Sequence, residues 1–326
     1  SFAAKFDAVL NAREMEGHLP KDADRDYAVQ NVSFDVAPGE IVCLVGESGS
    51  GKTTAAQAIM RLVPVTAGSV ALDGENILEL APDKLRVARR KMQMILQDPY
   101  ASLNPRQRAD AIVREPMDRM DVGKPHTRDQ RVAELFKLVG LRPEQRVLFP
   151  HQFSGGQRQR IGIARALASD PVLLICDEPV SALDVAIQAQ ILNLLRRLQK
   201  QLNLALLFIS HDLGVVRHVC DEVAVMYLGR FVEQGDRASL FRRPLHPYTW
   251  ALISSVPSAR NRDQDQSTRV RLEGDPPSPI NPAPGCRFAG RCPHAKDICR
   301  TEMPDLRPVD VNGLRRHVAC HFAGEI

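Results

Sequence analysis

The octapeptide GESGSGKT runs from Gly46 to Thr53, between the apolar run EIVCLV and the helical pattern KTTAAQAIMRLV. The run is as long as a buried strand, and the pattern spaces its apolar residues like one face of a helix. A glycine-rich turn between a strand and a helix lets successive backbone N–H groups surround the phosphates of a nucleotide. Lys52 is placed to reach the β- and γ-phosphate oxygens, and the Thr53 hydroxyl to bind Mg²⁺. The stretch therefore predicts a nucleotide-binding loop; the alternative is a chance glycine-rich turn.

Further apolar runs predict an α/β fold with a largely parallel sheet. PVLLIC (171–176) and LALLFIS (204–210) are strand-sized, and the segment 186–202 between them has apolar residues at helical spacing. EVAVMYLGRFVEQG (222–235) predicts a hairpin with its turn at LGR. Polar residues follow the first two runs, and α/β folds bind ligands at the carboxyl ends of parallel strands.

An acidic pair follows the first of these strands. Asp177 is placed to hold Mg²⁺ through its water shell, and Glu178 to orient and polarise the water that attacks the γ-phosphate. Taken alone, two carboxylates after an apolar strand are more often the start of a loop or a helix cap. The phosphate loop in the same chain favours the catalytic interpretation.

Composition limits the other functional classes. Of the 326 residues, 44% are hydrophobic and 25% are charged, as in an ordinary globular protein. The net charge of +4 is mild for a dedicated nucleic-acid binder. No apolar run approaches the ~20 residues that span a bilayer, and the N-terminal stretch lacks the apolar core of a signal peptide. We therefore expect a soluble protein whose membrane role comes through a partner.

A second glycine-containing helix start lies in FSGGQRQRIGIARAL (153–167). Ser154, Gly155 and Gly156 open this helix and make an anion-binding N-terminus that the chain's own phosphate loop does not need. The segment resembles the signature motif of ABC ATPases.

Three shorter segments resemble other motifs of the same ATPases. SALD (181–184) resembles their D-loop, His211 in ISHD their switch histidine, and Gln97 in ILQDPY their Q-loop glutamine. Each match alone is weak, but six elements occur in one order between Gly46 and His211. The sequence is identified as a member of the ABC ATPases.

The resemblance implies a P-loop NTPase fold with a helical signature subdomain, in which two chains sandwich two ATP molecules head to tail. It assigns catalysis to Glu178, His211 and Gln97, and Mg²⁺ binding to Thr53, Gln97 and Asp177. The nucleotide would contact Gly46, Glu47, Ser48, Gly49, Ser50, Gly51, Lys52, Thr53, Thr54, Gln97 and Asp177 of one chain and Ser154, Gly155, Gly156 and Gln157 of the partner chain. Asp184 would communicate across the interface.

The residue that stacks on adenine departs from the family pattern. The family usually places an aromatic residue upstream of the phosphate loop, and here His18 and Tyr27 are the candidates. Neither matches cleanly, and Tyr27 is equally explained by packing.

Finer matches indicate one branch of the family. QDPYASLNPR, SALDVAIQAQI, HDLGVVRHVCDEVAVMYLGR and HPYTWALISSVP resemble the second ATPase of bacterial dipeptide and oligopeptide importers, from about Val29 to Cys320. The resemblance implies a second ATPase subunit, identical or paralogous, two membrane-spanning permease subunits and an extracytoplasmic solute-binding protein. It places the chain on the cytoplasmic face of the bacterial inner membrane. The sequence leaves the imported solute open, because this chain would not touch it.

Two other classes of ABC ATPase are alternatives to a transport subunit. A soluble ABC ATPase that acts on nucleic acid or ribosomes usually has two ATPase units, a coiled-coil insertion or zinc modules in its core, and this chain has one unit. A regulatory subunit without turnover would not need Glu178 and His211. Both alternatives are therefore less favoured than transport.

The composition shifts near Asp236, where a proline-rich stretch with little periodicity begins. We expect an ATPase domain at 1–235, with a helical subdomain inserted at about 99–160, and a C-terminal Cys-rich, Pro-rich extension at 236–326. An extension of this size and composition cannot build a convincing core alone and usually needs a covalent or metal staple.

Four cysteines lie in the extension, at Cys286, Cys292, Cys299 and Cys320. An ATPase faces the reducing cytosol, where structural disulfides are unfavoured. The spacing C-x5-C-x6-C-x20-C lacks the close ligand pair of structural zinc sites, although His294, His317 and His321 keep zinc open as the second choice. Four unligated thiols are the remaining alternative.

Wide, irregular spacing suits a 4Fe–4S cluster, whose irons are reached from separate loops. The resemblance implies the same, because the C-terminal region of the peptide-importer ATPases carries such a cluster. We expect the cluster to staple the extension. Cys43, Cys176 and Cys220 lie in or beside core elements and should be ordinary buried thiols.

Overall fold

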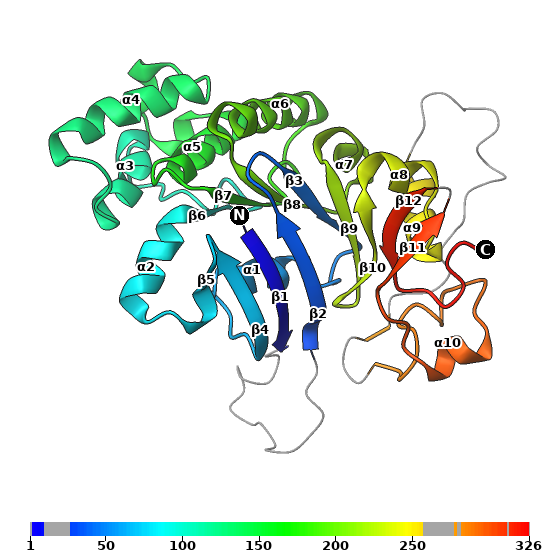
Figure 1. Cartoon of the computed structure of the whole chain (residues 1–326). Helices are drawn as coiled ribbons and strands as arrows, with labels where there is room; N and C mark the ends of the chain where they lie inside the picture. Colours follow the sequence, from blue (N-terminus) through cyan, green and yellow to red (C-terminus); the bar gives the residue numbers. More distant parts are fainter. Residues whose placement is uncertain (1, 10–26, 257–276, 279–281, 312, 326) are drawn as a thin grey trace. The chain divides into compact units, whose positions relative to one another are not determined.

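The computed structural model describes residues 2–9, 27–256, 277–278, 282–311 and 313–325 (Figure 1). The chain divides into two compact units. The first comprises Ser1–Ala3, Asp35–Ile41 and Ala71–Ile209, and the second comprises Ala4–Phe34, Val42–Val70 and Ser210–Ile326. The domain boundaries expected from the sequence stay a prediction. Within the described ranges, no helix has both the length and the apolar character needed to cross a membrane.

Strands β6 (Met92–Ile95), β7 (Leu173–Asp177) and β8 (Ala205–Ser210) form the parallel sheet of the first unit, in the order β8-β7-β6. Leu173 pairs with Met92 on one side and with Ala205 on the other. Every residue of β7 and β8 is buried. Strands that are covered on both faces need continuous apolar runs, and this explains why these segments do not alternate. Both predicted strands are confirmed.

The helices of the first unit are α2 (Pro82–Lys91), α3 (Ala109–Arg119), α4 (Arg128–Leu138), α5 (Gly155–Leu167) and α6 (Val185–Leu202). Short 3-10 helices lie at Ile77–Glu79, Pro125–Thr127, Pro143–Val147 and Pro150–Gln152. Helix α3 packs against both α4 and α5. The buried guanidinium of Arg128 fixes the loop between α3 and α4, because it donates to Asp118 at 2.9 Å and to Asp121 at 2.7 Å. Helix α6 confirms the predicted helix, and its buried residues recur at helical spacing, at Ile191, Leu194, Leu195 and Leu198.

The main sheet of the second unit contains β3 (Ile41–Val45), β9 (Glu222–Tyr227), β10 (Arg230–Asp236), β11 (Arg307–Val311) and β12 (Leu314–Val318), in the order β11-β12-β10-β9-β3. Strand β3 is parallel to β9, and the other pairs are antiparallel. Tyr227 pairs with Arg230, so the predicted hairpin is confirmed. Its helices are α1 (Lys52–Ile59), α7 (Leu213–Val219), α8 (Arg237–Arg242), α9 (Pro247–Ser254) and α10 (Asp297–Thr301).

A smaller sheet has the order β2-β1-β4-β5. Its strands are β1 (Phe2–Val9), β2 (Tyr27–Val36), β4 (Ala67–Leu72) and β5 (Glu75–Asn76), and Figure 1 shows β1 and β2 side by side. Helix α1 ends at Ile59, four residues before the end of its predicted pattern, because Arg61 takes a left-handed conformation with φ of 52°.

The C-terminal region continues the main sheet of the second unit. Strand β12 pairs with β10, where Glu233 lies opposite Val318. Glu233 and Arg316 are fully buried and form an ion pair at 3.0 Å. The carboxylate of Glu233 also accepts from the backbone N–H groups of Leu245 and His246. The region therefore gains its order from strand pairing and from a buried ion pair, two supports that its composition does not reveal.

Candidate nucleotide site

The phosphate loop follows β3 directly and ends where α1 begins. A Cβ atom on Gly46 would lie 2.2 Å from the carbonyl oxygen of Met226, so only glycine fits there. Gly51 has φ of 100°, and a Cβ atom there would lie 2.6 Å from the carbonyl oxygen of Ala28. Both glycines are therefore required by the backbone path of the loop as well as by its chemistry.

Lys52 lies inside this loop and is only 5% exposed. Its Nζ donates to the carbonyl oxygens of Gly46 and Glu47, both at 2.8 Å, and to Ser50 Oγ at 3.3 Å. The N-cap of α1, Gly51, offers no side-chain acceptor to the first helical turn, and that turn contains no acidic residue. A held ammonium beside an uncapped helix N-terminus is suited to bind an anion such as the phosphates of a nucleotide.

The acidic pair lies at the end of β7 in the first unit. Asp177 is 4% exposed, whereas Glu178 is half-buried just beyond the strand. Glu178 has a left-handed backbone with φ of 46°, and its N–H donates to the carbonyl oxygen of Ile209 at 3.0 Å. Gln97, just after β6, donates from Nε2 to Glu178 Oε2 at 3.0 Å. The fold thus joins two predicted site residues that are 81 positions apart.

The signature segment begins α5 with a reciprocal cap. Ser154 Oγ accepts from the N–H of Gln157 at 3.3 Å, and Gln157 Oε1 accepts from the N–H of Ser154 at 3.0 Å. Ser154 is exposed, whereas Gly156 is buried. A Cβ on Gly156 would lie 2.5 Å from Ile187 Cγ2 on α6. Gly156 therefore permits the close packing of α5 on α6, a role that the sequence did not predict.

Comparison with known proteins places the chain in a family. The ABC transporter family matches residues 29–181, and the family described as "Oligopeptide/dipeptide transporter, C-terminal region" matches residues 232–299. The oligopeptide transport ATP-binding protein AppF of Bacillus subtilis (strain 168) is 46% identical over 98% of this chain and 99% of its own length. The chain belongs to the ATP-binding proteins of the ABC transporter family.

Other similar proteins agree with this assignment. The probable peptide ABC transporter ATP-binding protein y4tS of Sinorhizobium fredii is 49% identical over 97% of this chain and 90% of its own length. The ATP-binding cassette MJ0796, solved as a dimer in a post-hydrolysis state with ADP and Pi, has a TM-score of 0.62 and 28% identity over 73% of this chain and 99% of that chain. CbiO1 of Clostridium perfringens, with a TM-score of 0.64 and 24% identity over 74% of this chain and 90% of that chain, shows the same fold. The chain is thus an ABC ATPase with the P-loop fold that its motifs predicted.

Asp184 and His211 are two further predicted residues of this ABC ATPase that the structure describes. Asp184 accepts from the N–H of Ile187 at 3.0 Å and so caps α6. His211 lies exposed directly after β8. His18 and the side chain of Tyr27 lie outside the described residues. The grouping of the complete predicted set around one nucleotide stays a prediction.

Two residues that contact the phosphate loop were not predicted from the sequence. Tyr248 on α9 accepts a hydrogen bond from the N–H of Glu47 at 2.9 Å, and Arg291 binds the Glu47 carboxylate. These partners are 201 and 244 positions from Glu47, so no local pattern links them. Both lie in segments of the C-terminal region of this ABC ATPase.

The four cysteines of the C-terminal region line one small cavity, together with His246, His294, His321 and Phe288. Burial raises the pKa of Cys286 to about 11, and it also raises the pKa values of Cys292 and Cys320. Among the residues that the structure describes, no three His, Cys, Asp or Glu side chains are grouped so as to hold a metal ion. Ligand geometry therefore supports neither the expected cluster nor the zinc alternative. Cys43, Cys176 and Cys220 are buried thiols, as predicted.

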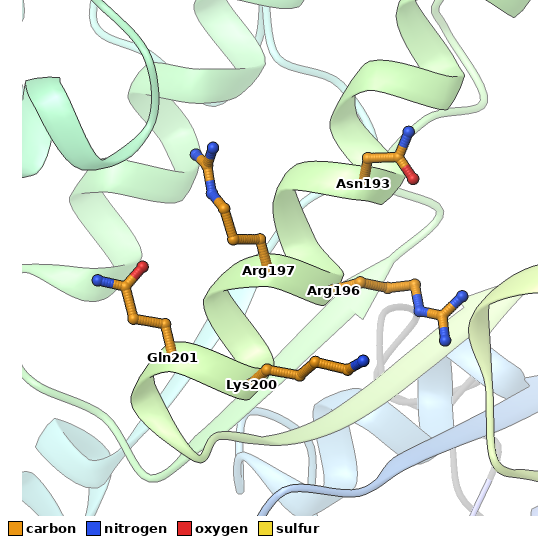
Figure 2. Close-up of a pocket in the computed structure, with 5 residues that line it drawn as sticks. All are labelled: Asn193, Arg196, Arg197, Lys200 and Gln201. Atoms are coloured by element: carbon orange, nitrogen blue, oxygen red, sulfur yellow. The ribbon is translucent and has the colours of Figure 1, made fainter.

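A separate pocket lies on α6, and its lining residues are none of those predicted for the nucleotide site. Figure 2 shows its lining side chains, which project from one stretch of the helix: Asn193, Arg196, Arg197, Lys200 and Gln201. One of its guanidinium groups, that of Arg197, donates to the carbonyl oxygen of Leu138 at 3.0 Å. None of the residues assigned to nucleotide binding lines this pocket.

Proposed function

We propose that this ABC ATPase powers the import of di- or oligopeptides, or of related small solutes. The observation that carries the proposal is the presence, in one chain, of an ABC transporter region and an oligopeptide/dipeptide transporter C-terminal region. The two similar proteins from B. subtilis and S. fredii, both named for peptide transport, support it.

In the proposed reaction, Lys52 and backbone N–H groups of the phosphate loop bind the phosphates, while the N–H of Glu47 stays bonded to Tyr248. Thr53, Gln97 and Asp177 would hold Mg²⁺, which neutralises charge on the phosphates when it is bound. Glu178 orients the attacking water and accepts its hydrogen bond, while the water oxygen displaces ADP from the γ-phosphorus. The hydrogen bond between Gln97 and Glu178 supports this role, because it limits the orientations of the carboxylate. His211 would contact the γ-phosphate.

The proposed partners are a second ATPase subunit, two permease subunits and an extracytoplasmic solute-binding protein, with the ATPase peripheral on the cytoplasmic face of the inner membrane. The dimeric MJ0796 cassette supports the first of these partners. The exposure of Ser154 supports it too, since a helix N-terminus that serves a partner's nucleotide must face outward. We propose no nucleic-acid partner.

The test of the nucleotide site is Glu178→Gln. This change keeps the side-chain shape but removes the charge, and we expect hydrolysis to fall by about 10²–10⁴-fold while ATP binding persists. Lys52→Ala should instead lose nucleotide binding. Hydrolysis by Glu178→Gln at the wild-type rate would contradict the role assigned to Glu178.

The test of transport is co-purification and reconstitution with the permease subunits. Peptide-loaded binding protein should stimulate hydrolysis in proteoliposomes, whereas RNA and ribosomes should not. Stimulation by RNA without permease subunits would favour the alternative of an ATPase that acts on nucleic acid.

We also propose that Cys286, Cys292, Cys299 and Cys320 hold a 4Fe–4S cluster that staples the C-terminal region. One observation supports the donor set: the four thiols line one cavity. Cluster chemistry agrees with it, because a cluster takes one thiolate per iron and its ligands need not converge on a single ion. The raised pKa values mean that these thiols are protonated without metal, so loading would release protons. Anaerobic purification followed by iron, acid-labile sulfide and zinc analysis tests this. Stoichiometric zinc without sulfide would overturn the cluster.

A further inference from the structure

Arg291, in the cysteine-bearing segment, makes a two-pronged ion pair with the phosphate loop. Its NH1 lies 2.8 Å from Glu47 Oε2 and its NH2 lies 3.1 Å from Glu47 Oε1. The Arg291 side chain is 8% exposed and that of Glu47 is 28% exposed. A bidentate pair with one nearly buried partner fixes position as well as charge.

The backbone of Glu47 is held from the same region. Its N–H donates to the hydroxyl of Tyr248, a fully buried side chain. The rings of Tyr227 and Phe288 pack around Tyr248, with centroids at 4.6 and 5.4 Å. Burial in this aromatic cluster raises the pKa of Tyr248, so the hydroxyl stays protonated. Both the backbone and the side chain of Glu47 are therefore fixed by rigid groups.

Arg291 is itself fixed in place by its own segment. Its N–H donates to the carbonyl oxygen of Phe288 at 3.0 Å, and the N–H of Cys286 donates to the carbonyl oxygen of Cys299 at 2.8 Å. Its NH1 also reaches the Tyr227 hydroxyl at 3.4 Å. The guanidinium thus enters the ion pair from an ordered turn between two of the cysteines.

Glu47 connects these contacts to the nucleotide site. Lys52 Nζ donates to the carbonyl oxygen of Glu47, so a shift of Glu47 would move the acceptor that holds the ammonium. We propose that Arg291 is a positioning residue for nucleotide binding, which acts through Glu47 on Lys52, with Tyr248 as its backbone counterpart. The inference rests on the proposed binding of nucleotide at this loop. It gives the C-terminal region a part in the affinity of this ATPase for nucleotide.

The experiment is an ADP titration of the full chain by calorimetry, together with KM and kcat for ATP. Arg291→Met keeps much of the side-chain volume but removes the charge, and we expect it to weaken ADP binding roughly tenfold. KM for ATP should rise more than kcat falls, because the change affects binding rather than chemistry. Arg291→Lys keeps the charge but cannot bind both carboxylate oxygens of Glu47 at once. We therefore expect an ADP affinity between those of the wild type and Arg291→Met.

Two further variants separate positioning from folding. Arg300→Met, at an exposed arginine on the same segment, should bind ADP within about twofold of the wild type. Glu47→Gln removes the same ion pair by changing the phosphate loop instead of Arg291. Its ADP affinity therefore tests the ion pair even if Arg291→Met fails to fold. The double variant should be no weaker than the weaker single variant, since both changes remove one interaction.

Two results would overturn the inference. The first is an ADP affinity equal to that of the wild type in both Arg291→Met and Glu47→Gln, with only a lower Tm in Arg291→Met. Arg291 would then stabilise the C-terminal region without affecting nucleotide binding. Equal ADP binding by the wild type and Lys52→Ala would instead refute the proposed nucleotide site, and the inference with it.

Discussion

The phosphate loop and the signature segment both place glycines at the start of a helix, but the fold treats them differently. Around the loop, Lys52 is buried and Glu47 is held by residues more than 200 positions away. At the signature segment, Ser154 is exposed and its capping partner lies three residues along the chain. One helix start is organised by tertiary contacts, and the other by local ones.

The N-terminal caps of the two helices, α1 and α5, also differ. The N-cap of helix α1, Gly51, makes no side-chain hydrogen bond to the first turn. In α5 the Ser154 hydroxyl already accepts from the N–H of Gln157. An anion that binds at the start of α5 would therefore meet a first turn in which one N–H group is already bonded to the Ser154 hydroxyl. The difference suits a loop that binds nucleotide within its own chain and a signature segment that serves a partner's nucleotide.

The largest expected effect is on stability and comes from a third tertiary contact, outside both helix starts: Arg316→Met leaves Glu233 buried without its cation. We expect the free energy of unfolding to fall by about 3–5 kcal/mol, because an uncompensated buried charge is costly. Urea denaturation measures it. Glu233→Gln/Arg316→Met should lose less than Arg316→Met, since it removes the unpaired charge. Equal losses would show that packing rather than charge joins β10 to β12.

Ser154→Asp should lower ATP hydrolysis through the signature segment without lowering the stability of the fold. Aspartate caps helices as well as serine does, so stability should stay within about 0.5 kcal/mol, while its charge repels a partner's phosphates. We expect hydrolysis to fall by roughly a hundredfold, comparable to the loss of one preorganised donor. ADP binding by the single chain should remain at the wild-type value. A parallel loss of ADP affinity would contradict the division between the two helix starts.

The smallest effect is expected for Ser154→Ala, which tests the local cap alone. Removing the hydroxyl should cost about 1 kcal/mol of stability, the usual value for an N-cap serine. Urea denaturation alongside Ser154→Asp, which keeps the cap, isolates this contribution. A loss of several kcal/mol would mean that Ser154 supports more of the fold than its hydrogen bonds with Gln157 indicate.

Some of the site could be predicted because its signals are local. The strand before Gly46, the helix after Gly51 and the helix that starts at Ser154 follow from apolar spacing and from the backbone that glycine and N-cap residues favour. The strand that ends at Asp177 was predicted for the same reason. The hydrogen bond between Gln97 and Glu178 could not be predicted in this way. It depends on the parallel pairing of β6 with β7, which brings the carboxyl ends of these two strands together.

The sequence by itself determined the α/β class, the phosphate loop, the signature helix and the family. Each strand, helix or motif is set by neighbouring residues, and the class and the family follow from the order of these elements along the chain. Only the tertiary structure decided that Arg291 and Tyr248 hold Glu47, that Gly156 admits Ile187 and that Arg316 pairs with Glu233. Contacts between distant segments leave no periodic pattern in the chain, since strand pairing and helix packing choose which side chains meet.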